Sequence, residues 1–526
     1  MTDATLFVGG RVFTGRRYCS ALLIEDGEVL VAGSEAEARR AAPSGTDVCA
    51  LDGDLVIPGL IDAHVHVAEA TRVRDGLTVG GAASLEAIAA SVGQWAAAHP
   101  TGTLVARGFD PERLPSAAWP TRQDLDEMSR DRPLVLIHAS GHVWLVNSVA
   151  LSMAGIDPGT PDPSGGKFGR DPDGAPDGRV YEGAIPSLGS RLPPPDRVEP
   201  EALLRTLEEA RAFGLTTIGA MNADPEETVE LRELAADGRL PTRLRVYLRG
   251  RRWEEYFRDP GGPSGPPDRF EVVGVKAFAD GAFGPRTAWL TTPYADDPTT
   301  AGMAAASDEE LRTLFEAARR RALVPAIHAI GDRAISHALG LLRDSPLPHG
   351  RRYRIEHAAL TPPELWAALG EVRPALVVQP GFVWSDAWLG LRLGPARQRW
   401  AYAFRTLIEH GHLLVGSSDA PYDPIDPWRG LRAAVQRTDP GGGSANPSTE
   451  ETLGVEDAIR LYTGNAGLAF GEPTLGWLEA GSPGDLVRLA APSLDAAISA
   501  GSTVVRGTWL AGVPAPADRP GSVQRT

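Results

Sequence analysis

The chain has little cysteine and no long apolar run. Its 526 residues include two cysteines, Cys19 and Cys49, which do not form a Cys-x-x-Cys pair, so neither a thiolate metal site nor a disulfide framework is expected. A reducing environment inside the cell is the simpler interpretation, although the sequence does not exclude one disulfide between the two cysteines. No apolar stretch reaches the roughly 20 residues of a membrane-spanning helix, and the N-terminus lacks a signal-peptide pattern. We therefore expect a soluble, cytoplasmic protein.

Basic residues are fewer than acidic ones. Lys and Arg total 52 and Asp and Glu total 68, which gives a net charge of −16. This balance argues against nucleic acid and anionic membranes as partners, so we expect a small-molecule substrate, while a homodimer remains open. The composition, 42% hydrophobic and 23% charged, is typical of globular proteins. The length fits one large barrel with additions or two to four smaller domains.

Both ends of the chain contain short strand-like segments. Within residues 1–57 these segments lie at 6–8, 21–24, 29–32 and 56–57, and the pairs Gly9-Gly10 and Asp26-Gly27 are plausible turns between them. Near the C-terminus, residues 485–489 and 503–509 have the same character. We therefore expect residues 1–57 and 471–526 to build one small β-domain together.

Between residues 58 and 470, eight apolar strands alternate with helical segments, a pattern that predicts a (β/α)₈ barrel. The strands are expected at 61–66, 215–220, 244–248, 272–278, 324–330, 353–357, 375–378 and 413–416. The first two are about 150 residues apart, far more than one βα unit needs. This interval predicts an insertion, about 67–210, with strands at 103–106 and 134–138 and a Pro/Gly/Asp-rich loop at 157–178. An insertion at this end of a strand is expected to overhang the active site.

Five of the eight expected strands end in a side chain that can bind a metal. His64 and His66 alternate on the first strand and so share a face. His328, His357 and Asp419 end the fifth, sixth and eighth, and the remaining strand is the fourth, which carries Lys276. Singly, each has a structural alternative: a polar strand edge, a packed core histidine or a capping carboxylate. Because the carboxyl ends of barrel strands meet at one rim, the set predicts a centre for zinc or a similar divalent ion.

Lys276 lies inside the apolar fourth strand, where an ammonium charge is costly. Burial lowers the pKa of a lysine and makes its neutral amine accessible. A neutral amine can capture carbon dioxide as a carbamate, an anionic group whose two oxygens can bridge two metals. The alternative is an ion pair with Asp280 or another carboxylate, and this residue alone does not decide between them.

Further polar residues are weaker candidates. His142 lies in the insertion and has two interpretations, a substrate contact above the metal centre or a structural histidine. Asp280 and Arg286 are further candidate substrate contacts. The remaining histidines considered occur in helical or loop contexts and are expected at the surface or in packing: His99, His337, His349, His410 and His412.

These motifs resemble the amidohydrolase superfamily, and more narrowly amidohydrolase family 3, in its N-substituted formamide deformylase-like branch. The resemblance covers nearly the whole chain, and its metal motifs are specific for the superfamily but not for a substrate. The metal motifs are 58–66 (PGLIDAHVH), 275–281 (VKAFADG), 328–332 (HAIGD), 354–357 (RIEH) and 416–421 (GSSDAP). The others are 107–110 (RGFD), 120–126 (PTRQDLD), 141–148 (GHVWLVNS) and 481–487 (GSPGDLV).

The resemblance implies a β-sandwich beside the barrel and a metal-dependent hydrolase of non-peptide carbon–nitrogen bonds. Two zinc ions per chain are implied: one on His64, His66 and Asp419, one on His328 and His357, with carbamylated Lys276 bridging both. A hydroxide between the metals then attacks an amide or formamide carbonyl, and Asp419 passes the proton to the leaving nitrogen. Residues 218–220 (IGA) depart from relatives that carry histidine and aspartate there, which bears on substrate preference rather than on the metal ligands. A lactonase or phosphoesterase, or a non-catalytic metal-binding barrel, are the alternatives.

Overall fold

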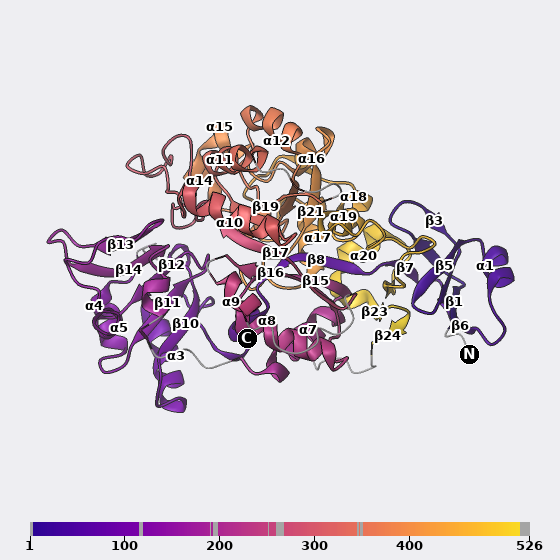
Figure 1. Cartoon of the computed structure of the whole chain (residues 1–526), viewed down its shortest axis with the longest axis horizontal. Helices are drawn as coiled ribbons and strands as arrows, with labels where there is room; N and C mark the ends of the chain where they lie inside the picture. Colours follow the sequence, from indigo (N-terminus) through magenta and orange to yellow (C-terminus); the bar gives the residue numbers. More distant parts are fainter. Residues whose placement is uncertain are drawn as a thin grey trace.

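Figure 1 shows the computed structural model, in which a barrel lies between an insertion and a β-domain. The structure describes residues 4–114, 119–189, 191–192, 198–250, 252–258, 268–344, 347 and 351–515. Of the sequence predictions, His349 and the last residues of the C-terminal segment lie outside the described residues. Within the described chain, no helix is both long enough and apolar enough to cross a bilayer.

The barrel is an eight-stranded, all-parallel sheet, as the alternating pattern predicts. Its strands, in sheet order, are β8 (Leu60–Val65), β15 (Leu215–Ala223), β16 (Arg243–Arg249), β17 (Phe270–Phe278), β18 (Val324–Ala329), β19 (Arg354–His357), β20 (Ala375–Val378) and β21 (Leu413–Gly416). A parallel bridge between Val65 and Ala420 brings the two edges together. The strands are buried along almost their whole length, which is expected when both faces of a parallel sheet are covered.

Helices cover the outside of the barrel (Figure 1). In α10 (Asp308–Arg320) the capping box of Ser307 and Glu310 fixes the start, and Leu311, Phe315 and Ala318 form one buried face. The other barrel helices include α7 (Pro200–Ala212), α8 (Pro225–Ala236), α11 (Asp332–Arg343), α12 (Trp366–Val372), α16 (Phe404–Glu409), α17 (Pro427–Val435), α18 (Val455–Leu461) and α19 (Gly464–Phe470).

The insertion after β8 begins with α2 (Val67–Asp75) and forms its own six-stranded sheet. The sheet order is β13 (Gly166–Arg170), β14 (Pro176–Glu182), β12 (Val143–Val146), β11 (Leu134–His138), β10 (Leu104–Phe109) and β9 (Leu77–Thr78). The predicted loop at 157–178 is wrong in part, because it contains β13 and the start of β14. These strands are joined by a tight turn in which the Asp171 N–H donates to the Ala175 carbonyl at 2.9 Å. The Asp, Pro and Gly residues around these two strands are typical of turns, so no clear strand pattern is visible in the sequence here.

The β-domain is made of two sheets. One has the order β5 (Glu28–Gly33), β4 (Ala21–Glu25), β1 (Ala4–Val8) and β6 (Asp47–Ala50). The other has the order β24 (Val513–Pro514), β23 (Val505–Leu510), β22 (Leu486–Leu489), β7 (Leu55–Pro58), β2 (Arg11–Phe13) and β3 (Tyr18–Cys19). In the second sheet, C-terminal β22 pairs with N-terminal β7, so both ends of the chain build this domain as predicted. Both cysteines are free thiols.

A buried ion pair joins the β-domain to the barrel. Arg243 of β16 donates from Nε and Nη2 to the Asp485 carboxylate at 2.7 and 3.0 Å, and both side chains are 4% exposed. We expect Asp485→Ala to lower the free energy of unfolding by about 3–5 kcal/mol, because it leaves a buried guanidinium without this partner. Urea denaturation of the metal-free protein measures this.

The matched control is Asp268→Ala, which removes a partner of the same guanidinium. Asp268 accepts from Arg243 Nη1 at 2.8 Å but is itself 55% exposed. Its loss should cost only about 0–1 kcal/mol. Equal effects of the two substitutions would contradict the assignment of the domain link to Asp485.

Candidate metal centre

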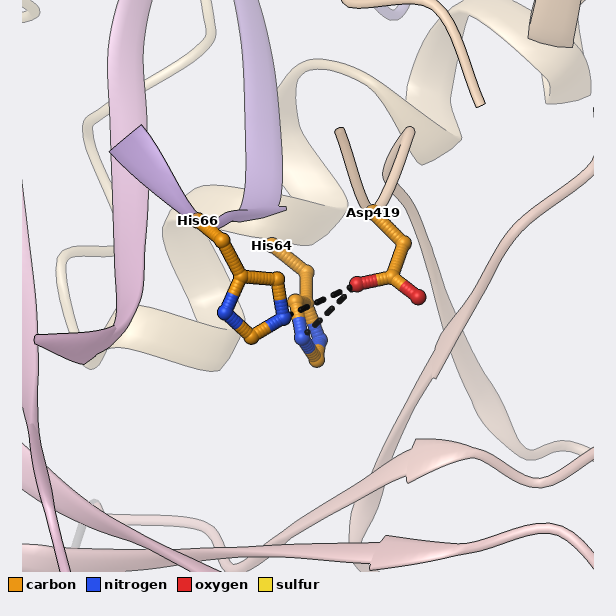
Figure 2. Close-up of side chains that lie close together, drawn as sticks. All are labelled: His64, His66 and Asp419. Carbon is orange, nitrogen blue, oxygen red and sulfur yellow. Dashed lines mark ion pairs between the residues drawn. The ribbon is translucent and has the colours of Figure 1, made fainter. Parts of the chain in front are cut away.

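Three predicted ligands meet at the carboxyl end of the barrel strands (Figure 2). His64 lies on β8, His66 directly follows it, and Asp419 follows β21. The Asp419 Oδ1 atom is 3.3 Å from His64 Nε2 and 3.2 Å from His66 Nε2. One ligand atom from each of the three lies within 4.8 Å of the others. This is the spacing that a shared cation requires.

The other predicted ligands lie beside this group. Lys276 Nζ on β17 is 3.3 Å from His64 Nε2. The His357 ring has its centroid 5.2 Å from that of His64 and 4.4 Å from that of His328. All six residues predicted as metal ligands therefore gather at one rim, although they come from five different strands.

Lys276 is 1% exposed. Among the described residues it forms no ion pair with Asp280, one of the carboxylate partners that the sequence left open. The Asp280 carboxylate instead accepts hydrogen bonds from the backbone N–H groups of Trp289, Ile330 and Gly331 at 2.8 to 3.0 Å. Burial lowers the pKa of Lys276 to about 8, against the opposing charges of Glu356 and Asp419. The neutral amine is therefore readily accessible near neutral pH.

Each of three histidines donates one ring N–H to a fixed acceptor. His64 Nδ1 donates to Glu356 Oε2 at 2.6 Å, and His357 Nδ1 donates to Gln379 Oε1 at 2.8 Å. His328 Nε2 donates to the backbone carbonyl of Gly281 at 3.0 Å. In each ring the other nitrogen keeps its lone pair, the form that a metal ligand needs. Burial holds the pKa of all three rings well below its usual value.

Glu356 is in turn held in place by Arg354. The guanidinium donates from Nε to Oε1 at 2.8 Å and from Nη2 to Oε2 at 3.0 Å, and both residues are fully buried. The positive charge of Arg354 and the negative charge of Glu356 thus neutralise each other inside the barrel. The same contact fixes the carboxylate that orients His64.

Asp419 provides the test of whether these residues fit a metal. Its Oδ1 atom is buried and has no hydrogen-bond donor among the described residues. It faces two imidazole nitrogens at 3.2 and 3.3 Å. Asp419 and His357 also have φ values of +60° and +73°, a conformation that costs about 1–3 kcal/mol and concentrates at functional sites. A divalent cation satisfies this set of lone pairs, so the residues fit a metal.

Comparisons with known proteins agree with this chemistry. A profile described as "Amidohydrolase family" matches residues 47–516. The chain belongs to the amidohydrolase family. It is 34% identical to the putative amidohydrolase YtcJ of Bacillus subtilis (strain 168), over 92% of this chain and 93% of the relative. It is 28% identical to N-substituted formamide deformylase of Arthrobacter pascens, over 93% of each chain.

Solved structures of metal-dependent hydrolases share the fold of this amidohydrolase. An uncharacterized metal-dependent hydrolase from Pyrococcus horikoshii OT3 superposes with a TM-score of 0.75 at 28% identity, covering 93% of this chain and 97% of that one. A second, from Pyrococcus furiosus, gives a TM-score of 0.70 at 28% identity, with 92% and 98% covered.

The insertion of this amidohydrolase reaches the rim through His142. The ring centroid of His142 is 4.9 Å from that of His328, and Nδ1 donates to Glu182 Oε2 at 2.8 Å. Burial disfavours the charged ring, but the nearby Glu182 carboxylate outweighs it and raises the pKa of His142. The structure thus brings this candidate to the metal centre, and its contact with substrate stays a prediction.

The other two candidate substrate contacts are engaged within the protein. Asp280 is fully buried, and its carboxylate accepts from one backbone N–H in the loop after β17 and from two directly after β18. Burial raises the pKa of its carboxyl to about 7. Arg286 pairs with Asp296 at 2.8 Å in the loop after β17. Their substrate roles remain predictions that these contacts do not favour.

The sequence interpretation missed residues whose role depends on contacts across the fold. Three of them each orient a histidine: Glu356, Gln379 and Glu182. Only Glu356 could have been suspected from the sequence, because it directly precedes the predicted ligand His357. His138 was also missed: it ends β11 and stacks on Trp119 at 5.1 Å, and burial lowers its pKa to about 3. The histidines assigned to surface or packing include His99 stacked on Trp95, His337 paired with Asp308, His410 on the Thr406 carbonyl, and half-buried His412.

Proposed function

We propose that this amidohydrolase uses two zinc ions to hydrolyse a non-peptide carbon–nitrogen bond, of the amide or formamide type, in a small molecule. The observation that carries the proposal is the buried Asp419 Oδ1, which has no hydrogen-bond donor in the described part of the chain and faces the nitrogens of His64 and His66. The relation to N-substituted formamide deformylase supports the choice of bond.

His64, His66 and Asp419 would hold one zinc ion, and His328 and His357 the other. The buried amine of Lys276 would be carbamylated, which replaces a costly cation with an anion suited to lie between two metals. When bound, zinc supplies Lewis acidity that polarises the substrate carbonyl and lowers the pKa of water.

Asp419 performs the proton transfer in this proposal. The oxygen of water bonds to the carbonyl carbon, and the carboxylate of Asp419 accepts a proton from that water. It delivers the proton to the nitrogen as the carbon–nitrogen bond breaks. The products are a carboxylate, or formate, and an amine.

A screen of N-formyl and N-acyl amines with zinc-loaded protein tests the proposal. We expect release of amine with at least one N-formyl or N-acyl compound under conditions in which matched esters stay intact. Hydrolysis of lactones or phosphoesters without any amide activity would instead support the alternative hydrolases. No turnover in a protein that binds less than one metal equivalent would support a non-catalytic barrel.

A further inference from the structure

We infer that the insertion completes the active site: His142 contacts the scissile group of the substrate through Nε2, and Glu182 is the positioning residue that holds the ring. This inference rests on the proposed function and deepens it. It makes the segment between β8 and α7 a contributor to the chemistry as well as a cover over the barrel mouth.

The turn that carries His142 is packed directly onto the metal centre. His142 lies between β11 and β12, with its ring 4.9 Å from that of the predicted ligand His328. The preceding Gly141 has φ +76°, and a Cβ there would lie 2.4 Å from the hydroxyl of Tyr422. Tyr422 in turn contacts His66 edge-on, with ring centroids 5.5 Å apart. The turn therefore touches residues beside both proposed metals.

Glu182 fixes His142 through two hydrogen bonds. Its carboxylate accepts from His142 Nδ1 at 2.8 Å, and its backbone N–H donates to the His142 carbonyl at 3.1 Å. Its side chain is 4% exposed. Glu182 also has φ +47°, a conformation that costs about 1–3 kcal/mol and is commonest at functional sites. The ring is thus held in one orientation by a strained, buried residue.

The His142–Glu182 pair also contacts the residue that orients His328. A Cβ on Gly281 would lie 2.0 Å from Glu182 Oε1, and the Gly281 carbonyl accepts from His328 Nε2 at 3.0 Å. Glu182 Oε1 is buried without a donor among the described residues. In a pair with a purely structural role, every buried polar atom is expected to form a hydrogen bond. The Oε1 atom of Glu182 does not form one with any described residue.

The second nitrogen of His142 is available to a ligand. Nδ1 is occupied by Glu182, whereas no described residue forms a hydrogen bond with Nε2, and the side chain is 15% exposed. A ring with one nitrogen fixed by a carboxylate and the other open beside a reaction centre is the arrangement of a substrate-contacting histidine.

A double-mutant cycle tests the inference on the best amide from the screen. We expect His142→Ala to lower kcat/KM about 100-fold with bound metal unchanged, and Glu182→Gln to lower it about 10-fold. The double variant should be no worse than His142→Ala, because Glu182 acts through His142. The matched controls are His337→Ala and Asp308→Asn, from a second histidine–carboxylate pair, joined at 2.6 Å on α10 and α11, whose side chains are 19% and 66% exposed. We expect these controls to retain wild-type kinetics.

Other outcomes overturn the inference. Wild-type rates in His142→Ala would exclude a substrate contact. Loss of bound metal from His142→Ala would show that His142 is a metal ligand instead. Additive effects of the two substitutions would show that Glu182 acts independently of His142. If the wild type hydrolyses no amide, the proposed function is wrong, but the substrate contact of His142 can still be tested.

Nitrogen NMR of ¹⁵N-histidine-labelled protein provides that test. An N-formyl amine should shift the Nε2 resonance that is missing in His142→Ala, and an unchanged resonance would refute the contact.

Discussion

Replacing Lys276 with alanine should lower kcat/KM by about 100-fold or more and remove part of the bound metal. The amine is 1% exposed and lies 3.3 Å from His64 Nε2, so its loss leaves a gap among the ligands. Lys276→Arg should fail as well, because a guanidinium stays cationic at any accessible pH and cannot become a carbamate. Steady-state kinetics and metal analysis of the purified variants measure both effects.

The chain offers a matched control for this experiment. Its only other lysine, Lys167, is exposed on β13, and Lys167→Ala should leave kinetics and metal content unchanged. With ¹³C-labelled bicarbonate, a carbamate carbon signal should appear in the wild type and in Lys167→Ala but not in Lys276→Ala. Acetate should restore part of the activity of Lys276→Ala by supplying carboxylate oxygens. An active, fully metallated Lys276→Arg variant would refute the carbamate.

Asp419→Asn should lower kcat by a factor of about 10² to 10⁴, the range for loss of a proton-transfer group. The amide keeps the size of the carboxylate but can neither accept the proton nor offer a charged ligand. Bound zinc should raise the melting temperature of the variant less than that of the wild type, because ligand stabilisation follows affinity. Activity assays and thermal unfolding with and without zinc measure the two effects.

The metal-free proteins give a further test of the same residue. Asp419 Oδ1 is buried and finds no donor among the residues that the structure describes, so removing its charge relieves a desolvation cost. Metal-free Asp419→Asn should therefore melt at or above the temperature of the metal-free wild type. Asp344→Asn, at an exposed ion pair with Arg312, is the control and should change neither activity nor zinc stabilisation. Full activity in Asp419→Asn would show that another residue moves the proton.

The barrel could be predicted because its strands are long apolar runs bounded by helical segments. All eight strands appear within a few residues of their predicted positions. The insertion was harder to predict, because the turn that connects β13 and β14 is rich in Asp, Pro and Gly and is typical of a loop. In the β-domain, β2, β3, β6 and β24 were missed for a similar reason: each has two to four residues, too few for a clear alternation.

The candidate ligands could be predicted because strand ends of a barrel converge by topology. The residues that orient them could not, since their role arises from contacts distant in sequence. Glu356 is 292 positions from the His64 that it orients, and Glu182 lies 40 positions from His142. No local pattern marks such pairs. An ion pair between Lys276 and Asp280 could likewise not be judged from the sequence, because it depended on the partners of the Asp280 carboxylate, which accepts from three backbone N–H groups.

The metal content of the intact protein tests the central claim most directly. Zinc-loaded protein, dialysed against metal-free buffer, is analysed by inductively coupled plasma mass spectrometry. We predict about two zinc ions per chain, as a two-metal hydrolytic centre requires. About one zinc ion per chain or fewer would contradict the proposed two-metal centre.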